Sequence, residues 1–201
     1  MLLKKRRPKQ QRLPEPVEQR PIFRDPRNFS LVVEKYQTIV FRYVFNMVHD
    51  YHQAEDLTQE IFAKVYRFLP SYNAKYPFSA WLLRIAHNHA VDYTRLRRLQ
   101  TVPYEAVANE DSVAEDHSVF VAPESVGPDE VSQRKFIQDA IYALPVDNRA
   151  VIVLRYLEGV KLEEIAYILG IPLGTVKSRI NRARLVLQRA LAQAFLERSR
   201  R

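Results

Sequence analysis

Apolar residues recur at intervals of three and four along most of this 201-residue chain, and this spacing restricts it to helical folds. The pattern runs from Phe29 to Met47, resumes from Leu57 to Phe68, and continues from about Phe78 to Arg98. It returns near Val131 and persists toward the C-terminus. No segment shows the strict apolar–polar alternation, bounded by turns, that is typical of strands. We therefore predict an all-α protein.

Interruptions of this periodicity predict where the helices end. The stretch HDYHQAED, residues 49–56, separates the first two helices, and Leu69-Pro70 ends the second. Farther along, Asp147 is predicted to cap a helix through its side-chain oxygen, and Gly159 to end it. The second helix is expected to bury one apolar stripe, which comprises Leu57, Ile61, Val65 and Phe68.

Charge divides the chain into blocks. Residues 1–27 hold nine Lys or Arg against three Asp or Glu, together with five prolines, which is typical of a disordered basic tail. Residues 101–130 hold eight acidic residues and no Lys or Arg, and we interpret them as a linker. The predicted organisation is therefore a tail at 1–27, a helical domain at 28–99, an acidic linker at 100–130 and a second helical domain at 131–201.

The overall composition narrows the possible partners and compartments. A formal net charge of +8 and a pI of about 9.7 indicate a polyanionic partner. The opening MLLKKRRPKQ has basic residues but no apolar stretch after them, so no secretory signal is predicted. No apolar run approaches the ~18 residues of a membrane span. We expect a cytoplasmic protein.

The sequence contains no residue pattern that indicates an enzyme. Without cysteine the chain can form no disulfide and no Cys-ligated zinc site. His49, His52 and Asp56 have a spacing that could suit a metal, but they straddle the expected helix break, so no metal site is predicted. Four glycines cannot build a Gly-rich phosphate loop. We predict no cofactor, no small-molecule substrate and no catalytic residues.

The most specific local signal is the segment LEEIAYILGIPLGTVKSRINRARLVL, from Leu162 to Leu187. Two amphipathic helical patterns flank a break in which Gly170 supplies positive φ and Pro172 suits the start of the next helix. Gly174 leaves room for a backbone phosphate at that helix N-terminus. The outward-facing side chains suit phosphates and base edges and comprise Lys177, Ser178, Asn181, Arg182 and Arg184. A helical hairpin with a solvated basic face is the alternative, but turn, glycines and basic face together favour a DNA-binding helix-turn-helix.

Two further segments have chemistry of their own. In AEDLTQEIFAKVYRFL, Asp56, Gln59, Glu60 and Lys64 point outward, so this mainly acidic rim suits either a positively charged protein partner or plain solvation. In NAKYPFSAWLLRIAHNHAVDYTRLRR, loop aromatics precede a helix rich in arginine. Aromatic rings beside cations are what unstacked single-stranded bases require. Trp81 taken alone is more typical of a core residue.

Three segments resemble the bacterial sigma factors of the sigma-70 family, in the extracytoplasmic-function (ECF) group. They are DLTQEIFAKVYRFL, FSAWLLRIAHNHAVDYTRLRR and LPVDNRAVIVLRYLEGVKLEEIAYILGIPLGTVKSRINRAR. The resemblance covers residues 28–99 and 131–190, and the short linker is similar to that of this minimal group. It implies a region 2 helical bundle and a C-terminal region 4 helix-turn-helix. The melting Trp pair of housekeeping sigma factors is replaced here by Trp81-Leu82.

The resemblance also implies partners and residue roles. A sigma factor binds core RNA polymerase and promoter DNA, and an anti-sigma factor is expected to hold it inactive. The coiled coil of the largest polymerase subunit would be gripped by Asp56, Gln59, Glu60 and Phe62. The −10 element would be captured and opened by Tyr72, Asn73, Tyr76, Trp81, Arg84, Asn88 and Arg95. The −35 element would be read by Gly174, Thr175, Lys177, Ser178, Arg179, Asn181 and Arg182.

Two alternatives remain open at the level of sequence. A two-domain transcriptional regulator could bind duplex DNA through its helix-turn-helix without being a polymerase subunit, although it would not need the segments that contain Asp56 and Tyr72. The acidic linker is either a solvated tether or a polyanion that lies in a basic channel built for RNA. The basic tail has no assigned role.

Overall fold

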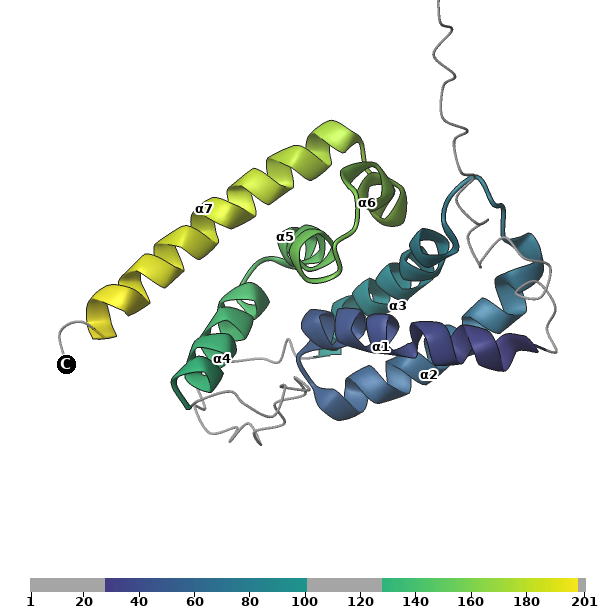
Figure 1. Ribbon diagram of the computed structural model, residues 1–201, viewed down its shortest axis with the longest axis horizontal. Coiled ribbons are helices and arrows are strands. Elements are labelled where there is room, and N and C mark those ends of the chain that lie inside the picture. Colours follow the sequence, from purple (N-terminus) through teal and green to yellow (C-terminus); the bar gives the residue numbers. More distant parts are fainter. Residues whose placement is uncertain (1–27, 101–127, 199–201) are drawn as a thin grey trace, which may run out of the picture.

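The computed structural model describes the backbone of residues 28–100 and 128–198 and the side chains of residues 28–97 and 135–192 (Figure 1). Every regular element in these ranges is helical, which confirms the predicted fold class. The tail and almost all of the linker predicted above lie outside the described residues. The α-helices are α1 (Phe29–Val48), α2 (Tyr51–Phe68), α3 (Phe78–Gln100), α4 (Pro128–Tyr142), α5 (Val146–Ile152), α6 (Leu162–Leu169) and α7 (Leu173–Arg198).

Helices α1, α2 and α3 pack into the N-terminal bundle (Figure 1). Each contributes side chains that lie fully inside, among them Tyr43 and Met47 from α1, Ile61 from α2 and Leu82 from α3. Burying each such side chain contributes roughly 1.5–3 kcal/mol. The three-and-four spacing of these residues therefore creates the core that holds the bundle together.

The corner between α1 and α2 is tighter than the sequence predicts. His49 adopts a left-handed conformation with φ 57°, and its N–H donates to Phe45 O at 2.7 Å. The Asp50 carboxylate then accepts from Gln53 N at 3.0 Å and caps α2. The predicted break between the two helices is confirmed, but it is confined to His49 and Asp50 instead of residues 49–56, because this cap lets α2 begin at Tyr51.

The far end of α2 differs from prediction in a single side chain. Phe68 was expected in the buried stripe, but it is 51% exposed. A short 3₁₀ turn, Leu69–Ser71, follows α2 directly and places Leu69 in the core at 2% exposure. The apolar stripe therefore continues through Leu69, and Phe68 faces outward.

The C-terminal half consists of α4, α5, a π-helical turn at Val153–Leu157, α6 and α7. Gly159 and Gly170 adopt φ values of 67° and 65°, and Gly170 is the C-cap of α6, as predicted. Asp147 is not the cap of α5, because the helix begins one residue before it, at Val146. Its carboxylate instead accepts a hydrogen bond from Arg179 of α7 at 2.9 Å.

The two halves share one continuous cluster of buried side chains. Helix α6 packs against α3, and α4 lies near the end of α1 (Figure 1). Arg149 is 7% exposed and donates across the boundary to Met47 O at 2.5 Å. Arg42 of α1 pairs with Glu158 at 2.5 Å. The helical domains predicted as separate units thus lie against each other in this structure.

Candidate nucleic-acid and protein interfaces

Helices α6 and α7 form a helix-turn-helix whose second helix presents a polar surface. Val176, Ile180 and Ala183 are buried, which turns the opposite side of α7 toward solvent. Thr175 and Arg179 are partly buried at the edge of this surface. The remaining residues predicted for the −35 element are exposed on it: Gly174, Lys177, Ser178, Asn181 and Arg182. One helix therefore displays amides, hydroxyls and cations on a single face, as a major-groove surface requires.

Arg179 and Arg182 differ in how firmly they are held. The Arg179 guanidinium donates to Asp147 at 2.9 Å, and its side chain is only 22% exposed, so it braces α7 against α5. Arg182 makes only long contacts, at 3.5 and 3.4 Å, to the backbone oxygen and hydroxyl of Ser178. Arg182 can therefore exchange these contacts for a base edge or a phosphate at little cost.

Gly174 lies at the start of α7, where packing within the protein does not require a glycine. A methyl group added there would meet no atom within 4 Å, and the residue is exposed. Packing inside the protein thus does not explain the missing side chain. An approaching phosphate at the helix N-terminus, where N–H groups and the helix dipole attract anions, would explain it.

The loop between α2 and α3 rests on a packed aromatic cluster. Tyr72 is 8% exposed, and its ring lies 5.1 Å from that of Phe78 and 5.3 Å from that of Trp81, centroid to centroid. Its hydroxyl donates to Tyr76 O at 2.9 Å. The carbonyl of the exposed Asn73 side chain accepts from Lys75 N at 3.1 Å. Tyr72 and Trp81 therefore support the loop from below, whereas Asn73 and Tyr76 lie at its surface.

Three polar residues predicted for the −10 element continue from this loop along α3. Arg84, Asn88 and Arg95 are all exposed and are spaced by four and seven residues, which places them on one face of the helix. The structure thus joins a loop that bears the half-buried Tyr76 to a line of cations and an amide. Single-stranded DNA needs both kinds of contact, stacking for bases and charge for phosphates.

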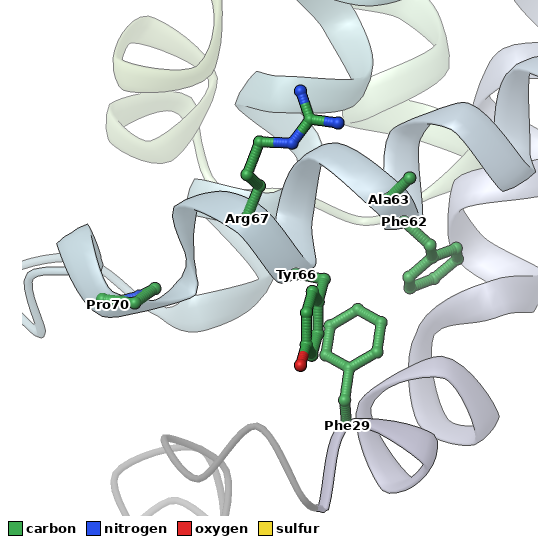
Figure 2. A pocket seen from close by; sticks show the side chains of 6 residues that line it. All are labelled: Phe29, Phe62, Ala63, Tyr66, Arg67 and Pro70. Atoms are coloured by element: carbon green, nitrogen blue, oxygen red, sulfur yellow. The ribbon is translucent and has the colours of Figure 1, made fainter.

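The outer face of α2 combines an acidic rim with an apolar hollow. Asp56, Gln59 and Glu60 are exposed, as the sequence predicts. Phe62 is 7% exposed, and its ring contributes to a pocket at the C-terminal end of α2 (Figure 2). The pocket is lined by Phe29, Phe62, Ala63, Tyr66, Arg67 and Pro70. The Phe29 and Tyr66 rings meet edge to face at 5.1 Å, so the hollow has a rigid aromatic wall.

Glu60 is held in place by a residue that the sequence analysis passed over. His89 Nε2 lies 2.6 Å from the Glu60 carboxylate, and Lys64 Nζ lies 2.7 Å from His89 Nδ1. Because an ammonium group can only donate, Nδ1 must accept and Nε2 must carry the proton that Glu60 receives. His89 therefore links Lys64 to Glu60 and orients this carboxylate on the rim.

A second histidine, which is largely buried, lies on the opposite side of α3. His87 Nδ1 lies 2.8 Å from the hydroxyl of Tyr43, which is fully buried. Burial lowers the pKa of His87 from its ordinary 6.5 to about 4 and raises the pKa of the Tyr43 phenol. Both groups are therefore neutral at physiological pH, and the hydrogen bond between them is part of the bundle core.

Neither metal binding nor membrane insertion gains support from the described residues. Within residues 28–97 and 135–192, no group of three or more His, Asp or Glu side chains is arranged to hold a metal ion. No helix in the described part of the chain is both long and apolar enough to cross a membrane.

Comparison with known proteins decides between a sigma factor and a free-standing transcriptional regulator. The family model Sigma-70 region 2 matches residues 32–100, and the model Sigma-70, region 4 matches residues 137–187. The RNA polymerase sigma-H factor of Pseudomonas aeruginosa is 35% identical over 181 residues, which cover 86% of this chain and 91% of that protein. The ECF RNA polymerase sigma factor SigW of Bacillus subtilis is 35% identical, with coverage of 83% and 90%. The chain belongs to the ECF group of the sigma-70 family.

As a sigma factor, the protein binds core RNA polymerase and directs initiation at promoters, and the free-standing regulator considered above is not supported. The fold agrees with this family. A crystal structure of the sigma factor RpoE in complex with the anti-sigma factor NepR from Bartonella quintana matches with a TM-score of 0.62 and 24% identity. The match covers 83% of this sigma factor and 98% of that chain.

Several residues that shape the surfaces of this sigma factor were not predicted. Tyr167 stacks on Tyr76, Glu158 pairs with Arg42, and His89 orients Glu60. The partners in these three pairs are between 29 and 116 positions apart in sequence, so no local pattern reports them. Sequence periodicity could have marked Tyr167 only as a residue on the less buried side of α6.

Proposed function

We propose that this ECF sigma factor recognises promoters through two separate surfaces, the exposed face of α7 for the −35 element and the α2–α3 loop with α3 for the −10 element. The observation that carries the proposal is the alignment of Arg84, Asn88 and Arg95 on one exposed face of α3, continuous with the aromatic loop. Duplex DNA would not require such a surface, whereas an opened strand would.

On α7 the roles follow from chemistry and exposure. Lys177 is positioned for phosphate, and Ser178, Asn181 and Arg182 for base edges in the major groove. Arg179 positions α7 through Asp147 and reaches DNA only at its edge. Gly174 and Thr175 lie at the helix N-terminus, where backbone N–H groups bind a phosphate.

In the −10 region some residues are proposed to support the α2–α3 loop and others to contact the DNA strand. Tyr72 and Trp81 hold the loop, while Asn73 and Tyr76 meet an unpaired base. Arg84, Asn88 and Arg95 then follow the strand along α3. Because Tyr72 is buried and only the half-buried Tyr76 ring of this loop could stack on a base, capture of a single base is expected.

The rim of α2 is the proposed docking site for the coiled coil of the largest polymerase subunit. Asp56, Gln59 and Glu60 supply exposed polar contacts, and the aromatic hollow around Phe62 accepts an apolar side chain (Figure 2). An apolar centre beside a polar rim is the usual anatomy of a protein–protein interface. His89 acts here as a positioning residue for Glu60.

Further parts of the proposal concern the whole chain. The promoter-binding units correspond to residues 28–99 and 131–201, joined by the linker at 100–130. The protein acts in the cytoplasm as a binding subunit and catalyses no reaction itself. An anti-sigma factor regulates it, in keeping with the complex known for the Bartonella relative.

The proposal is tested by run-off transcription with core RNA polymerase and fragmented genomic DNA. Addition of this protein should produce discrete new transcripts with a shared pair of upstream elements. Arg84→Ala should weaken use of the −10 element, while Lys177→Ala should weaken binding at the −35 element. Active core polymerase that yields no new transcript with this protein would contradict the proposed function.

The docking surface is tested separately with Asp56→Arg. Reversing this exposed charge should reduce polymerase affinity by at least about a hundredfold, because a like charge would face the positively charged partner. Glu163→Arg is the matched control, since Glu163 is also an exposed carboxylate but lies on α6, away from the rim of α2. Circular dichroism checks that both variants stay folded. Equal polymerase binding by the two variants would contradict the assignment.

A further inference from the structure

The proposed −10 base site is already occupied in this structure by a side chain of the other half. Tyr167 of α6 stacks on Tyr76, with ring centroids 3.7 Å apart and an interplanar angle of 16°. The Arg84 guanidinium lies 4.9 Å from the centroid of the same Tyr167 ring. An aromatic stack and a nearby cation are the two contacts that the proposal assigns to a captured base and its strand.

We infer that Tyr167 is an intramolecular competitor for the −10 base, which takes the place of that base on Tyr76 and Arg84 while the two halves of the free protein are closed. This inference rests on the proposed −10 role of Tyr76 and Arg84. One face of the Tyr76 ring cannot stack on Tyr167 and on a nucleobase together. The strand can therefore bind only after α6 has moved away from α3.

The contacts around Tyr167 are those of an interface that can open. Glu158 is 1% exposed at its side chain and pairs with Arg42 across the boundary, yet its Oε1 atom has no hydrogen-bond partner. Burial raises the pKa of this carboxyl group. Arg149 reaches across to Met47 O, and its Nε atom is likewise buried without a partner. Because these buried charges are incompletely satisfied, their desolvation offsets part of the stabilisation that they give to the closed arrangement.

Closure affects the two proposed DNA surfaces differently. Helix α6 lies between α3 and α7 and packs against both (Figure 1). It stacks Tyr167 on Tyr76 and brings the same ring close to the Arg84 guanidinium, whereas Lys177, Asn181 and Arg182 on α7 meet no such contact and stay exposed. The closed protein is therefore blocked for the single strand but not for duplex DNA that carries a −35 element.

The test uses the full chain and measures closure and DNA binding separately. The absence of cysteine allows two dyes to be attached through Glu34→Cys on α1 and Gln188→Cys on α7, both exposed positions. Energy transfer between the dyes reports opening. Fluorescence anisotropy reports binding of a labelled single-stranded oligonucleotide that carries the nontemplate −10 strand of a promoter mapped by run-off transcription. A labelled duplex with the −35 element serves as the second probe.

Tyr167→Ala should lower energy transfer and raise affinity for the single strand by about tenfold, because apparent affinity scales with the open fraction. Affinity for the −35 duplex should not change. Tyr167→Phe keeps the ring and should behave like the unmodified chain, as should Tyr156→Ala, which removes another exposed tyrosine of the same half. Arg42→Ala loosens the interface from a second point and should act in the same direction as Tyr167→Ala.

Two results would overturn the inference. One is unchanged energy transfer and strand affinity in both Tyr167→Ala and Arg42→Ala. The other is opening without any gain in strand affinity, which would make Tyr167 an interface residue only. In either case, the run-off assay with polymerase then tests Tyr76→Ala and Arg84→Ala. Reduced use of the −10 element by these variants would mean that the −10 assignment holds and only the competition by Tyr167 has failed. Normal use of the −10 element would mean that the −10 assignment has failed as well.

Discussion

Helix α7 carries the side chains proposed to contact DNA on one continuous surface, whereas the proposed −10 region collects its side chains from a loop and a helix that are held together by packing. The surface of α7 requires only that the helix forms and buries Val176, Ile180 and Ala183. The −10 region requires Tyr72 and Trp81 beneath the loop. Stability and DNA recognition should therefore be separable on α7 and coupled in the −10 region.

The largest effect is expected from removal of the support beneath the −10 loop. Tyr72→Ala should lower the free energy of unfolding by about 3–5 kcal/mol, because it empties a buried aromatic site, and should abolish use of the −10 element. Tyr72→Phe keeps the ring and loses the hydroxyl bond to Tyr76 O, which costs about 1 kcal/mol. Urea denaturation and run-off transcription measure the two properties. Loss of transcription without loss of stability in Tyr72→Ala would break the proposed coupling.

Acid should destabilise the N-terminal bundle through His87. Its pKa is lowered to about 4 in the folded protein, so between pH 6.5 and 4 the unfolded chain binds a proton that the folded chain does not. The contribution is fully present above pH 6.5 and is lost as the pH falls toward 4, by about 3 kcal/mol at most.

Denaturation curves over this pH range test the His87 prediction. His87→Gln can still accept from Tyr43 through its amide oxygen and should flatten the pH dependence of stability. His52→Gln is the control, because His52 is exposed. An identical acid slope in the unmodified chain and in His87→Gln would exclude His87 as the cause.

On α7 a single substitution should change specificity without changing the fold. Arg182→Ala is expected to cost about 1–3 kcal/mol of binding free energy and to relax specificity at one −35 position, if this residue contacts a base edge. Arg184→Ala removes a neighbouring exposed cation and should weaken binding evenly across sequences. Binding to a library of −35 variants distinguishes the two. An even loss for Arg182→Ala would make it a phosphate contact.

The smallest effect is expected from Gly174→Ala at the start of α7. This substitution tests most directly whether stability and DNA recognition are separable on α7, because the two should change in opposite directions. Gly174→Ala places a methyl group in open space, so stability should be unchanged or rise by about 0.5 kcal/mol. Binding of the −35 duplex should weaken, since the methyl group would meet the approaching phosphate. Thermal denaturation and duplex anisotropy measure the two quantities. Unchanged duplex affinity would remove the phosphate role of Gly174.

Local residue patterns predicted much of the fold and most of the exposed side chains of α7. The helices, the left-handed end of α6 at Gly170 and the buried stripe of α7 all follow from spacing along one stretch of chain. Errors arose where one residue changed a boundary. Asp50 shortened the expected break, Asp147 entered the helix it was expected to cap, and the turn at Leu69–Ser71 turned Phe68 outward. Each of these outcomes depends on backbone geometry that spacing does not report.

The sequence by itself determined that the protein is helical, that it belongs with the sigma factors and which side chains α7 displays, because the direction of a side chain on a helix depends only on its position in that helix. Only the tertiary structure decided that Tyr167 lies on Tyr76, that Glu158 is buried against Arg42 and that His89 orients Glu60. These contacts join residues far apart in sequence. These contacts form only if the apolar surface buried between the packed helices outweighs the cost of removing charged groups from water. That balance depends on the whole packed structure and cannot be derived from a local residue pattern.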